Sequence, residues 1–365
     1  MKKKEKIFFI LFCIVFFGLT CLAWFGPNKE FSQTERRQLA KFPQTTKQAV
    51  FSGTWMEKFE TYALDQFPFR EQMRTMKALN HKYVYHQKDN DGIYYVDGHI
   101  SDMDPEVNKD VVNKGVNTIN KWYEKHIKNT DVNVYASLIM DKNCFLADKN
   151  GYLAMDYNAL ETQFCKTINK NIEYIDIKNL LSIDDYYKTD THWKQENIQD
   201  VAKELAHSMG VELKMEYEEK TIDAPFYGVY YGQLGLPVKP DKISYLYNDI
   251  FDDCKVFDHA NQREIPVYDL ELATGRDPYE MFLSGSLSVI TIENNNATTK
   301  KELVIFRDSF GSSIAPLFIE GYKKITILDM RYLHESLIEK FVKFDKQDVL
   351  FLYSTSVMNN ATSFK

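Results

Sequence analysis

Three apolar runs near the C-terminal end constrain the fold most: ELVIF (302–306), KITILDM (324–330) and DVLFLYS (348–354). Their apolar residues are continuous, as in strands that are buried on both faces of a parallel sheet, and helical stretches separate the runs. VNVYASLIM (132–140) and NIEYIDI (171–177) have the same character. Because strands that alternate with helices build α/β domains, the sequence predicts an α/β fold with a mainly parallel sheet flanked by helices.

The segments around these strands indicate further elements. Residues 55–85 suit two helical runs interrupted at Pro68, residues 89–100 suit a hairpin, and residues 110–128 suit a helix. Residues 214–298 are richer in Tyr, Gly, Asp and Pro than their surroundings. We expect this block to form a β-rich insertion in the folded domain.

The N-terminus combines a basic tail with a long apolar run. After MKKKEK, residues 7–25 form an uncharged run of 19 residues, and about 20 apolar residues cross a bilayer. Lysines stay on the cytoplasmic side, so we expect residues 1–27 to be a single-pass cell-membrane anchor with a cytoplasmic N-terminus. Residues 28–54 would then be a polar juxtamembrane linker, and residues 55–365 an extracytoplasmic folded domain. A cleaved signal peptide is the alternative, since it shares the basic start and the apolar middle.

The charge and the cysteines restrict the class of partner and of site. The chain carries a formal charge of −7, and the tail contributes four lysines and one glutamate, which leaves the exported part near −10. This balance disfavours nucleic acid, which selects basic surfaces. Cys144, Cys165 and Cys254 lie outside the apolar run without a CxxC spacing, so no zinc site is expected. One disulfide, such as Cys144 with Cys165, fits an oxidising compartment, but the pairing stays open.

FRDSFGSS (306–313) places Ser309 at a strand-to-helix turn. Ligands of parallel α/β sheets bind at the carboxyl ends of strands. The helix that follows, capped by Ser312 or Ser313, would offer N–H groups to a developing oxyanion. Ser309 is therefore a candidate nucleophile; the alternative is a turn or capping serine, which is common at such positions.

A serine nucleophile needs a base, and YYKTDTHWK (186–194) supplies a histidine beside an acid. Asp190 and His192 point the same way if this segment is extended. Asp190 can then accept from one imidazole nitrogen while the other nitrogen faces Ser309. Trp193 would shield this pair from water or, alternatively, is a core aromatic that begins the next helix. The sequence predicts a triad in the chain order Asp, His, Ser.

Four motifs together resemble those of the DHHW and AlgJ/AlgX-like proteins. They are TERRQLAKFP (34–43), FETYALDQFPFR (59–70), DTHW (190–193) and RDSF (307–310). That family consists of exported, SGNH-hydrolase-like O-acetyltransferases of polysaccharide modification. The chain departs from the family motif at Thr191, where the family has a second histidine.

The resemblance implies roles and partners. Ser309 would carry an acetyl group, His192 would be its base, and Asp190 would orient the histidine, with no metal or cofactor. The acceptor would be a hydroxyl of a cell-surface or exported polysaccharide. Since acetyl-CoA does not cross membranes readily, the resemblance also implies a membrane-bound O-acyltransferase as the partner that supplies acetyl groups, and a single-domain, anchored AlgJ-like arrangement.

Three further residues are candidates for binding the oxyanion or the substrate: Phe310 through its backbone N–H, Arg331 after the strand KITILDM, and Trp193. A salt-bridged surface arginine is the alternative for Arg331. Two other functions stay open at this point. One is a carbohydrate acetylesterase that uses the same triad, with water as acceptor, and the other is a non-catalytic anchored scaffold whose aromatic strip in YGVYYGQLG (227–235) binds sugar rings.

Overall fold

The structure, a computed structural model, describes residues 3–104 and 106–364. The chain forms two compact units, Met1–Asp91 with Tyr231–Lys239 and Gly92–Tyr230 with Pro240–Lys365. The boundaries expected for the linker and the folded domain stay a prediction, because compactness alone does not show which segments fold independently.

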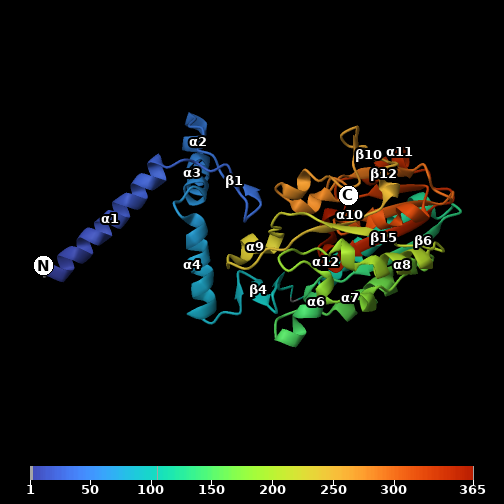
Figure 1. Ribbon diagram of the computed structural model, residues 1–365, viewed down its shortest axis with the longest axis horizontal. Coiled ribbons are helices and arrows are strands. Elements are labelled where there is room, and N and C mark those ends of the chain that lie inside the picture. The colour runs from blue at the N-terminus through green and yellow to red at the C-terminus, as the bar shows by residue number, and fades with distance from the viewer. Residues whose placement is uncertain (1–2, 105, 365) are drawn as a thin grey trace. The chain divides into compact units, whose positions relative to one another are not determined.

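The larger unit, Gly92–Tyr230 with Pro240–Lys365, is built on a central eight-stranded sheet (Figure 1). Its strands lie in the order β11 (Arg263–Ile265), β10 (Cys254–Asp258), β12 (Val289–Asn294), β14 (Lys324–Leu328), β13 (Glu302–Arg307), β15 (Asp348–Ser354), β6 (Asn133–Ile139) and β7 (Glu173–Tyr174). The five strands from β14 to β7 are parallel. β12, β10 and β11 extend the sheet as antiparallel strands at one side. The predicted α/β fold with a mainly parallel sheet is confirmed.

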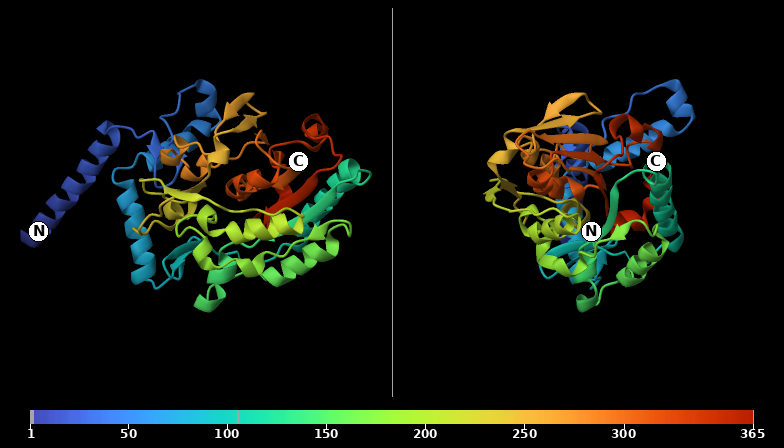
Figure 2. Two further views of the ribbon diagram at one scale, coloured as in Figure 1. Left: turned by 45° about the vertical axis from the view of Figure 1, so that its right-hand side comes forward. Right: turned by 90° about the vertical axis from the view of Figure 1, so that its right-hand side faces the viewer.

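Helices cover both faces of this sheet (Figure 2). The apolar run of β13 explains why, since Leu303 and Ile305 enter one buried core while Val304 and Phe306 enter the other. The first core includes α8 (Gln199–Ser208) and α10 (Gly311–Ile314), and the second includes α5 (Lys109–Trp122), α7 (Tyr157–Thr167), α11 (Ile338–Phe341) and α12 (Thr355–Asn359). A strand buried on both faces therefore reads as a continuous apolar run.

Several short elements complete the larger unit. The hairpin predicted over 89–100 is formed by β4 (Ile93–Val96) and β5 (His99–Asp102). A second antiparallel pair consists of β8 (Glu218–Thr221) and β9 (Ser244–Tyr247). Two further helices are α6 (Asn143–Leu146) and α9 (Val229–Leu234), the latter running across a boundary between the units. The disulfide suggested from the sequence is not formed, because Cys144, Cys165 and Cys254 are free.

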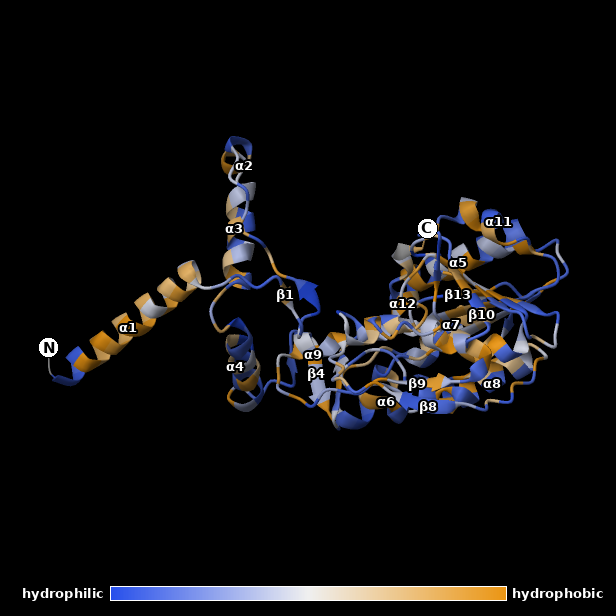
Figure 3. Cartoon of the chain, turned by 45° about the horizontal axis from the view of Figure 1, so that its top comes forward, coloured by the Kyte–Doolittle hydropathy of each residue, from blue (hydrophilic) through white to orange (hydrophobic). Residues whose placement is uncertain are grey.

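The smaller unit begins with α1 (Lys3–Phe25), which is long and apolar enough to cross a membrane and is the most uniformly hydrophobic helix in Figure 3. The interruption predicted at Pro68 is confirmed, since it separates α3 (Thr54–Asp65) from α4 (Arg70–Tyr83). The remaining elements are β1 (Phe31–Ser32), β2 (Arg37–Gln38), α2 (Lys47–Phe51) and β3 (Asp89–Asn90).

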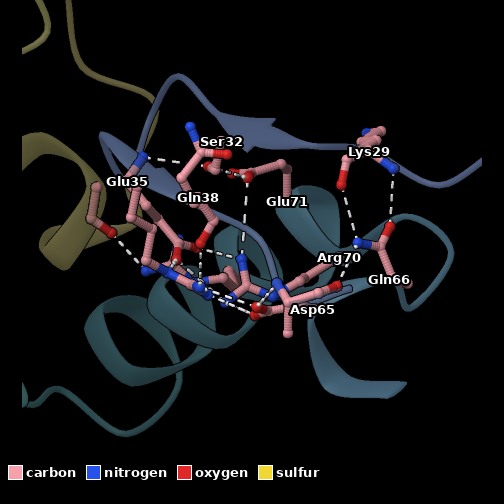
Figure 4. A network of polar contacts seen from close by, with 12 residues as sticks. Lys29, Ser32, Glu35, Gln38, Asp65, Gln66, Arg70 and Glu71 are labelled. Atoms are coloured by element: carbon pink, nitrogen blue, oxygen red, sulfur yellow. Dashed lines mark hydrogen bonds and ion pairs between the residues drawn. The ribbon is translucent and has the colours of Figure 1, made fainter. Parts of the chain in front are cut away.

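An ion-pair network joins β1 and β2 to α3 and α4 (Figure 4). Glu35 accepts hydrogen bonds from Arg37, Arg70 and Arg74, and Asp65 accepts from Arg37 and from the backbone of residue 40. The hydrogen bond from Arg37 lowers the pKa of Asp65 to about 2. Two of the motifs that carry the family resemblance, residues 34–43 and 59–70, are thus held together by charge-assisted hydrogen bonds.

Candidate active site

The turn after β13 is built on two buried charged residues. The Arg307 guanidinium donates to the carbonyl oxygens of Asp308 and Gly285, both at 3.2 Å, and lies 3.5 Å from a carboxylate oxygen of Asp329. Asp308 accepts from the N–H of Phe310 at 3.0 Å, and from the N–H and hydroxyl of Ser354 at 2.8 and 2.7 Å. Both side chains are fully buried, so this charged pair fixes the turn that presents Ser309.

The turn brings the three predicted triad residues together in a chain of hydrogen bonds. His192 Nε2 lies 2.8 Å from Ser309 Oγ, and His192 Nδ1 lies 2.6 Å from Asp190 Oδ1. Asp190 Oδ1 also accepts from the N–H of His192 at 3.0 Å. Asp190 is fully buried, whereas Ser309 and His192 are only partly buried. The proposed nucleophile and base, Ser309 and His192, are therefore accessible to solvent, whereas the carboxylate of Asp190 is not.

Asp190 is fixed from two sides. Its Oδ2 accepts from the N–H of Val229 at 2.8 Å, and its carbonyl oxygen accepts from Lys142 Nζ at 2.8 Å. Gly228 lets the two segments approach, because a Cβ at this position would lie 2.4 Å from Asp190 Cα. A side chain at residue 228 would therefore push the N–H of Val229 away from the carboxylate.

Lys142 is a buried cation that holds the segment before the triad. It is 1% exposed, and its Nζ also donates to the carbonyl oxygens of Tyr187 at 2.8 Å and Lys188 at 3.3 Å. Burial lowers the pKa of Lys142 to about 8. A buried charge needs hydrogen-bond partners, and here main-chain carbonyl groups supply them, so the ammonium group and the turn geometry depend on each other.

Aromatic rings surround the imidazole. Tyr279 stacks on His192 with the ring centroids 3.8 Å apart and the planes 10° from parallel, and Phe310 lies at 4.9 Å. Trp193 is fully buried, and its Nε1 donates to Ser313 Oγ at 2.8 Å. Trp193 therefore lies behind the turn as a core aromatic packed against Phe310. It does not begin the next helix, because it lies in an isolated bridge with Tyr186.

Two of the groups expected to bind the oxyanion or the substrate, the N–H of Phe310 and the guanidinium of Arg331, instead donate hydrogen bonds to aspartates. The N–H of Phe310, expected to bind an oxyanion, donates to Asp308 Oδ1 within the turn. Arg331 donates to both carboxylate oxygens of Asp329, at 2.9 and 2.7 Å; burial opposes its ionisation, but this pairing raises the pKa of the guanidinium. Among the described residues, Arg331 makes no hydrogen bond to Ser309.

The serine caps expected for the next helix are wrong. α10 begins at Gly311 after Phe310, without a side-chain cap, and it gives way after one turn to a 3₁₀ helix over Ala315–Gly321. Ser312 and Ser313 lie inside α10 and are buried. Pro316, which lacks a backbone N–H, stands at the start of the 3₁₀ segment and prevents a regular continuation of α10.

The sequence missed Lys142 and Tyr279. Lys142 follows the predicted strand 132–140 closely, and a lysine just after a buried strand is a signal that could have been considered. Tyr279 lies in a tyrosine-rich block with nothing to distinguish it. Among the described residues, no group of His, Cys, Asp and Glu side chains is arranged to hold a metal ion.

Solved structures share this architecture. A DHHW family protein from Eubacterium siraeum is 21% identical with a TM-score of 0.60, and the match covers 74% of this chain and 93% of that one. This chain has the fold of that DHHW family protein. Bacillus cereus PatB1 carrying a sulfonyl adduct is 20% identical with a TM-score of 0.58, over 73% of this chain and 97% of PatB1.

A more distant likeness is to the O-acetyltransferase domain of Pseudomonas putida AlgJ, at 10% identity and a TM-score of 0.44, over 73% of this chain and 92% of that one. No protein-family model matches the sequence, and no curated protein does either. The resemblance to DHHW proteins that the short motifs carry therefore holds at the level of the fold.

Proposed function

We propose that this protein is a membrane-anchored, extracytoplasmic O-acetyltransferase that moves acetyl groups through an acetyl-serine onto hydroxyls of a polysaccharide. The observation that carries the proposal is the hydrogen-bond chain from Asp190 through His192 to Ser309. The same order of acid, imidazole and hydroxyl defines nucleophilic serine chemistry on unrelated folds. α1 would anchor the chain, and a membrane-bound O-acyltransferase would supply the acetyl groups.

In the first half-reaction, His192 Nε2 takes the proton of Ser309 while Oγ attacks the carbonyl carbon of the acetyl donor. The imidazolium then returns the proton to the leaving group as the bond to the donor breaks, which leaves an acetyl ester on Ser309. Asp190 keeps the Nδ1 proton in place and stabilises the imidazolium. The N–H of Ser309 has no hydrogen-bond partner among the described residues, and we assign it to the developing oxyanion.

In the second half-reaction, the same imidazole nitrogen removes the proton of a sugar hydroxyl, whose oxygen attacks the acetyl-serine. The ester bond to Ser309 breaks, and Ser309 Oγ recovers a proton from the imidazolium. Phe310 and Tyr279 are both buried and pack beside His192, where they hold the imidazole ring in place. Water could also act as acceptor, so an esterase that uses the same triad is the second candidate, favoured by the partial exposure of Ser309.

PatB1 lends support because it has this fold and carries a sulfonyl adduct, and a sulfonyl group attaches covalently to a nucleophile. The test is mass spectrometry of the full chain in detergent after brief incubation with p-nitrophenyl acetate. We expect one acetyl adduct, located on Ser309, that is absent from Ser309→Ala and His192→Ala. Ser312→Ala, which removes the buried hydroxyl of a nearby serine, is the matched control and should keep the adduct.

Absence of an adduct on the wild-type chain, together with no release of nitrophenol above background, would refute the nucleophile and favour the scaffold. If the adduct forms, the transferase and the esterase are distinguished by incubating the acetylated enzyme with bare and with acetylated glycan. Net gain of ester on the bare glycan supports the transferase, and net loss from the acetylated glycan supports the esterase.

A further inference from the structure

The smaller unit exposes an unusual number of large apolar side chains. Outside α1, eighteen of the described residues have an exposed large apolar side chain, and thirteen of these lie between residues 42 and 85. They are Phe42, Val50, Phe51, Met56, Leu64, Phe67, Phe69, Met73, Met76, Leu79, Tyr83, Val84 and Tyr85. We call this set the apolar surface of the smaller unit. Contiguous exposed apolar surface marks a site of interaction with another apolar phase or with a protein.

In α4 the usual arrangement of a surface helix is reversed: its charged side chains point into the unit and its apolar side chains point outward. A water-exposed helix turns its apolar face inward, but α4 points Arg70 and Arg74 inward to Glu35. Its outward residues at helical spacing are apolar: Met73, Met76, Leu79 and Tyr83. Figure 4 shows the inward side of this arrangement, where the ion pairs are satisfied. The polar side of α4 has its partners within the unit, whereas the large apolar side chains on its other side are exposed.

One residue of the apolar surface, Phe42, belongs to an aromatic cluster at the end of the anchor. Trp24, at the end of α1, has its ring centroid 6.3 Å from that of Phe59 on α3, and Phe59 stacks on Trp55 at 5.1 Å. Phe42 and Tyr62 complete this aromatic cluster. Trp and Tyr are enriched where a membrane meets water, which is where the last turn of a spanning helix must lie.

The charge of residues 28–91, which include the apolar surface, fits an anionic lipid surface. Residues 28–91 carry eleven Lys and Arg against eight Asp and Glu, whereas residues 92–365 carry thirty against forty-three. Interfacial helices combine exposed Trp, Phe and Leu with Lys and Arg, and anionic headgroups attract such segments. The acidic remainder of the chain is repelled by the same surface.

We propose that the apolar surface of residues 42–85 lies in the headgroup region of the bilayer that α1 spans, so that the smaller unit is a second, interfacial membrane contact. The inference rests on the anchoring role of α1 in the proposed function. It goes beyond that function because it assigns α2, α3 and α4 to the lipid. A protein partner or a second copy of this chain is the competing occupant.

The test is photo-crosslinking of the full chain in vesicles of phosphatidylglycerol and phosphatidylcholine. The photoreactive residue p-benzoylphenylalanine replaces Phe51, which is 90% exposed, or Met76, and lipid adducts are measured by mass spectrometry. The same replacement at Phe16, inside α1, reports on the anchor. The replacement at Leu153, an exposed residue of the larger unit, is the matched control.

We expect lipid adducts at Phe51 and Met76 with a yield within about threefold of that at Phe16, and about tenfold less at Leu153. A urea denaturation midpoint equal to that of wild type shows that each variant is folded, whether or not Ser309 is acetylated. Adducts at Phe16 alone would overturn the interfacial contact and leave the anchor intact. Crosslinked dimers in place of lipid adducts at Phe51 and Met76 would assign the surface to a second copy. Absence of adducts at Phe16 would refute the anchor and this inference together, without touching the chemistry of Ser309.

Discussion

Lys142 Nζ lies 2.8 Å from the carbonyl oxygen of Asp190, so a buried ammonium group holds the main chain of the residue whose carboxylate lies 2.6 Å from the imidazole. The same nitrogen also donates hydrogen bonds to the carbonyl oxygens of Tyr187 and Lys188. Three acceptors from one short segment thus converge on one side chain. The position of His192 over Ser309 depends on a residue that touches neither of them.

Replacing Lys142 by methionine should lower the rate of Ser309 acylation by about tenfold or more, since several buried carbonyl groups lose their donor and the segment relaxes. The burst of nitrophenol release from p-nitrophenyl acetate measures this rate. A positioning role also predicts an altered alkaline side of the pH–rate profile, because Lys142 itself has a pKa of about 8. Lys188→Met, at a neighbouring exposed lysine, should change neither quantity; equal losses in both variants would contradict the role.

The stacking of Tyr279 on His192 predicts a difference between two substitutions. An aromatic face stabilises a cation placed over it, and in the proposed mechanism His192 becomes cationic when it takes the proton of Ser309. Tyr279→Leu should therefore slow acylation by about fivefold to tenfold. Tyr279→Phe keeps the ring and loses only the hydrogen bond to Ser313 Oγ, so its rate should stay close to wild type. Equal rates for the two variants would show that stacking does not matter.

The sequence predicted the triad because its determinants are local. Asp190 and His192 share one short motif, and Ser309 follows a strand whose apolar run is unmistakable. The contributions of Lys142 and Tyr279 arise from tertiary contacts. In the sequence, Lys142 is marked only by its place just after a buried strand, and Tyr279 lies in a tyrosine-rich block with nothing to distinguish it.

The strand predicted over 171–177 illustrates a different limit. Only Glu173–Tyr174 pair with the sheet, at its edge. Ile172 enters one core, whereas Ile175 and Ile177 enter the other. The apolar run therefore predicted burial correctly, but an apolar run does not show where strand pairing ends and irregular buried chain begins.

The packing of Gly311 against Arg307 predicts a large cost for one added methyl group. A Cβ at residue 311 would lie 2.5 Å from Arg307 Cβ and 2.8 Å from Cγ. Because Arg307 is buried and bonded to two carbonyl groups, it has little room to move. Gly311→Ala should lower the free energy of unfolding by about 1–3 kcal/mol, measured by urea denaturation. Ser312→Ala, one residue further on, should cost less; a Gly311→Ala variant as stable as wild type would refute this account of the turn.

Glu196 predicts how stability depends on pH. Its Oε2 is buried without a partner among the described residues, and burial raises its pKa from 4.5 to about 7. Since the folded-state pKa lies above the unfolded value, the stabilising contribution is complete below pH 4.5 and is lost as the pH rises through 7. The difference between the two pKa values corresponds to about 3 kcal/mol as an upper limit.

Glu196→Gln removes this titration. The variant should match wild type at about pH 4.5 and exceed its free energy of unfolding increasingly up to pH 8, because a neutral amide avoids the cost of a buried, unpaired charge. Urea denaturation across this range gives the slope for each protein. Glu271→Gln, at an exposed glutamate, serves as the control and should keep the wild-type slope. Parallel curves for wild type and Glu196→Gln would mean that Glu196 reaches solvent when it ionises, and that its carboxylate does not limit stability at neutral pH.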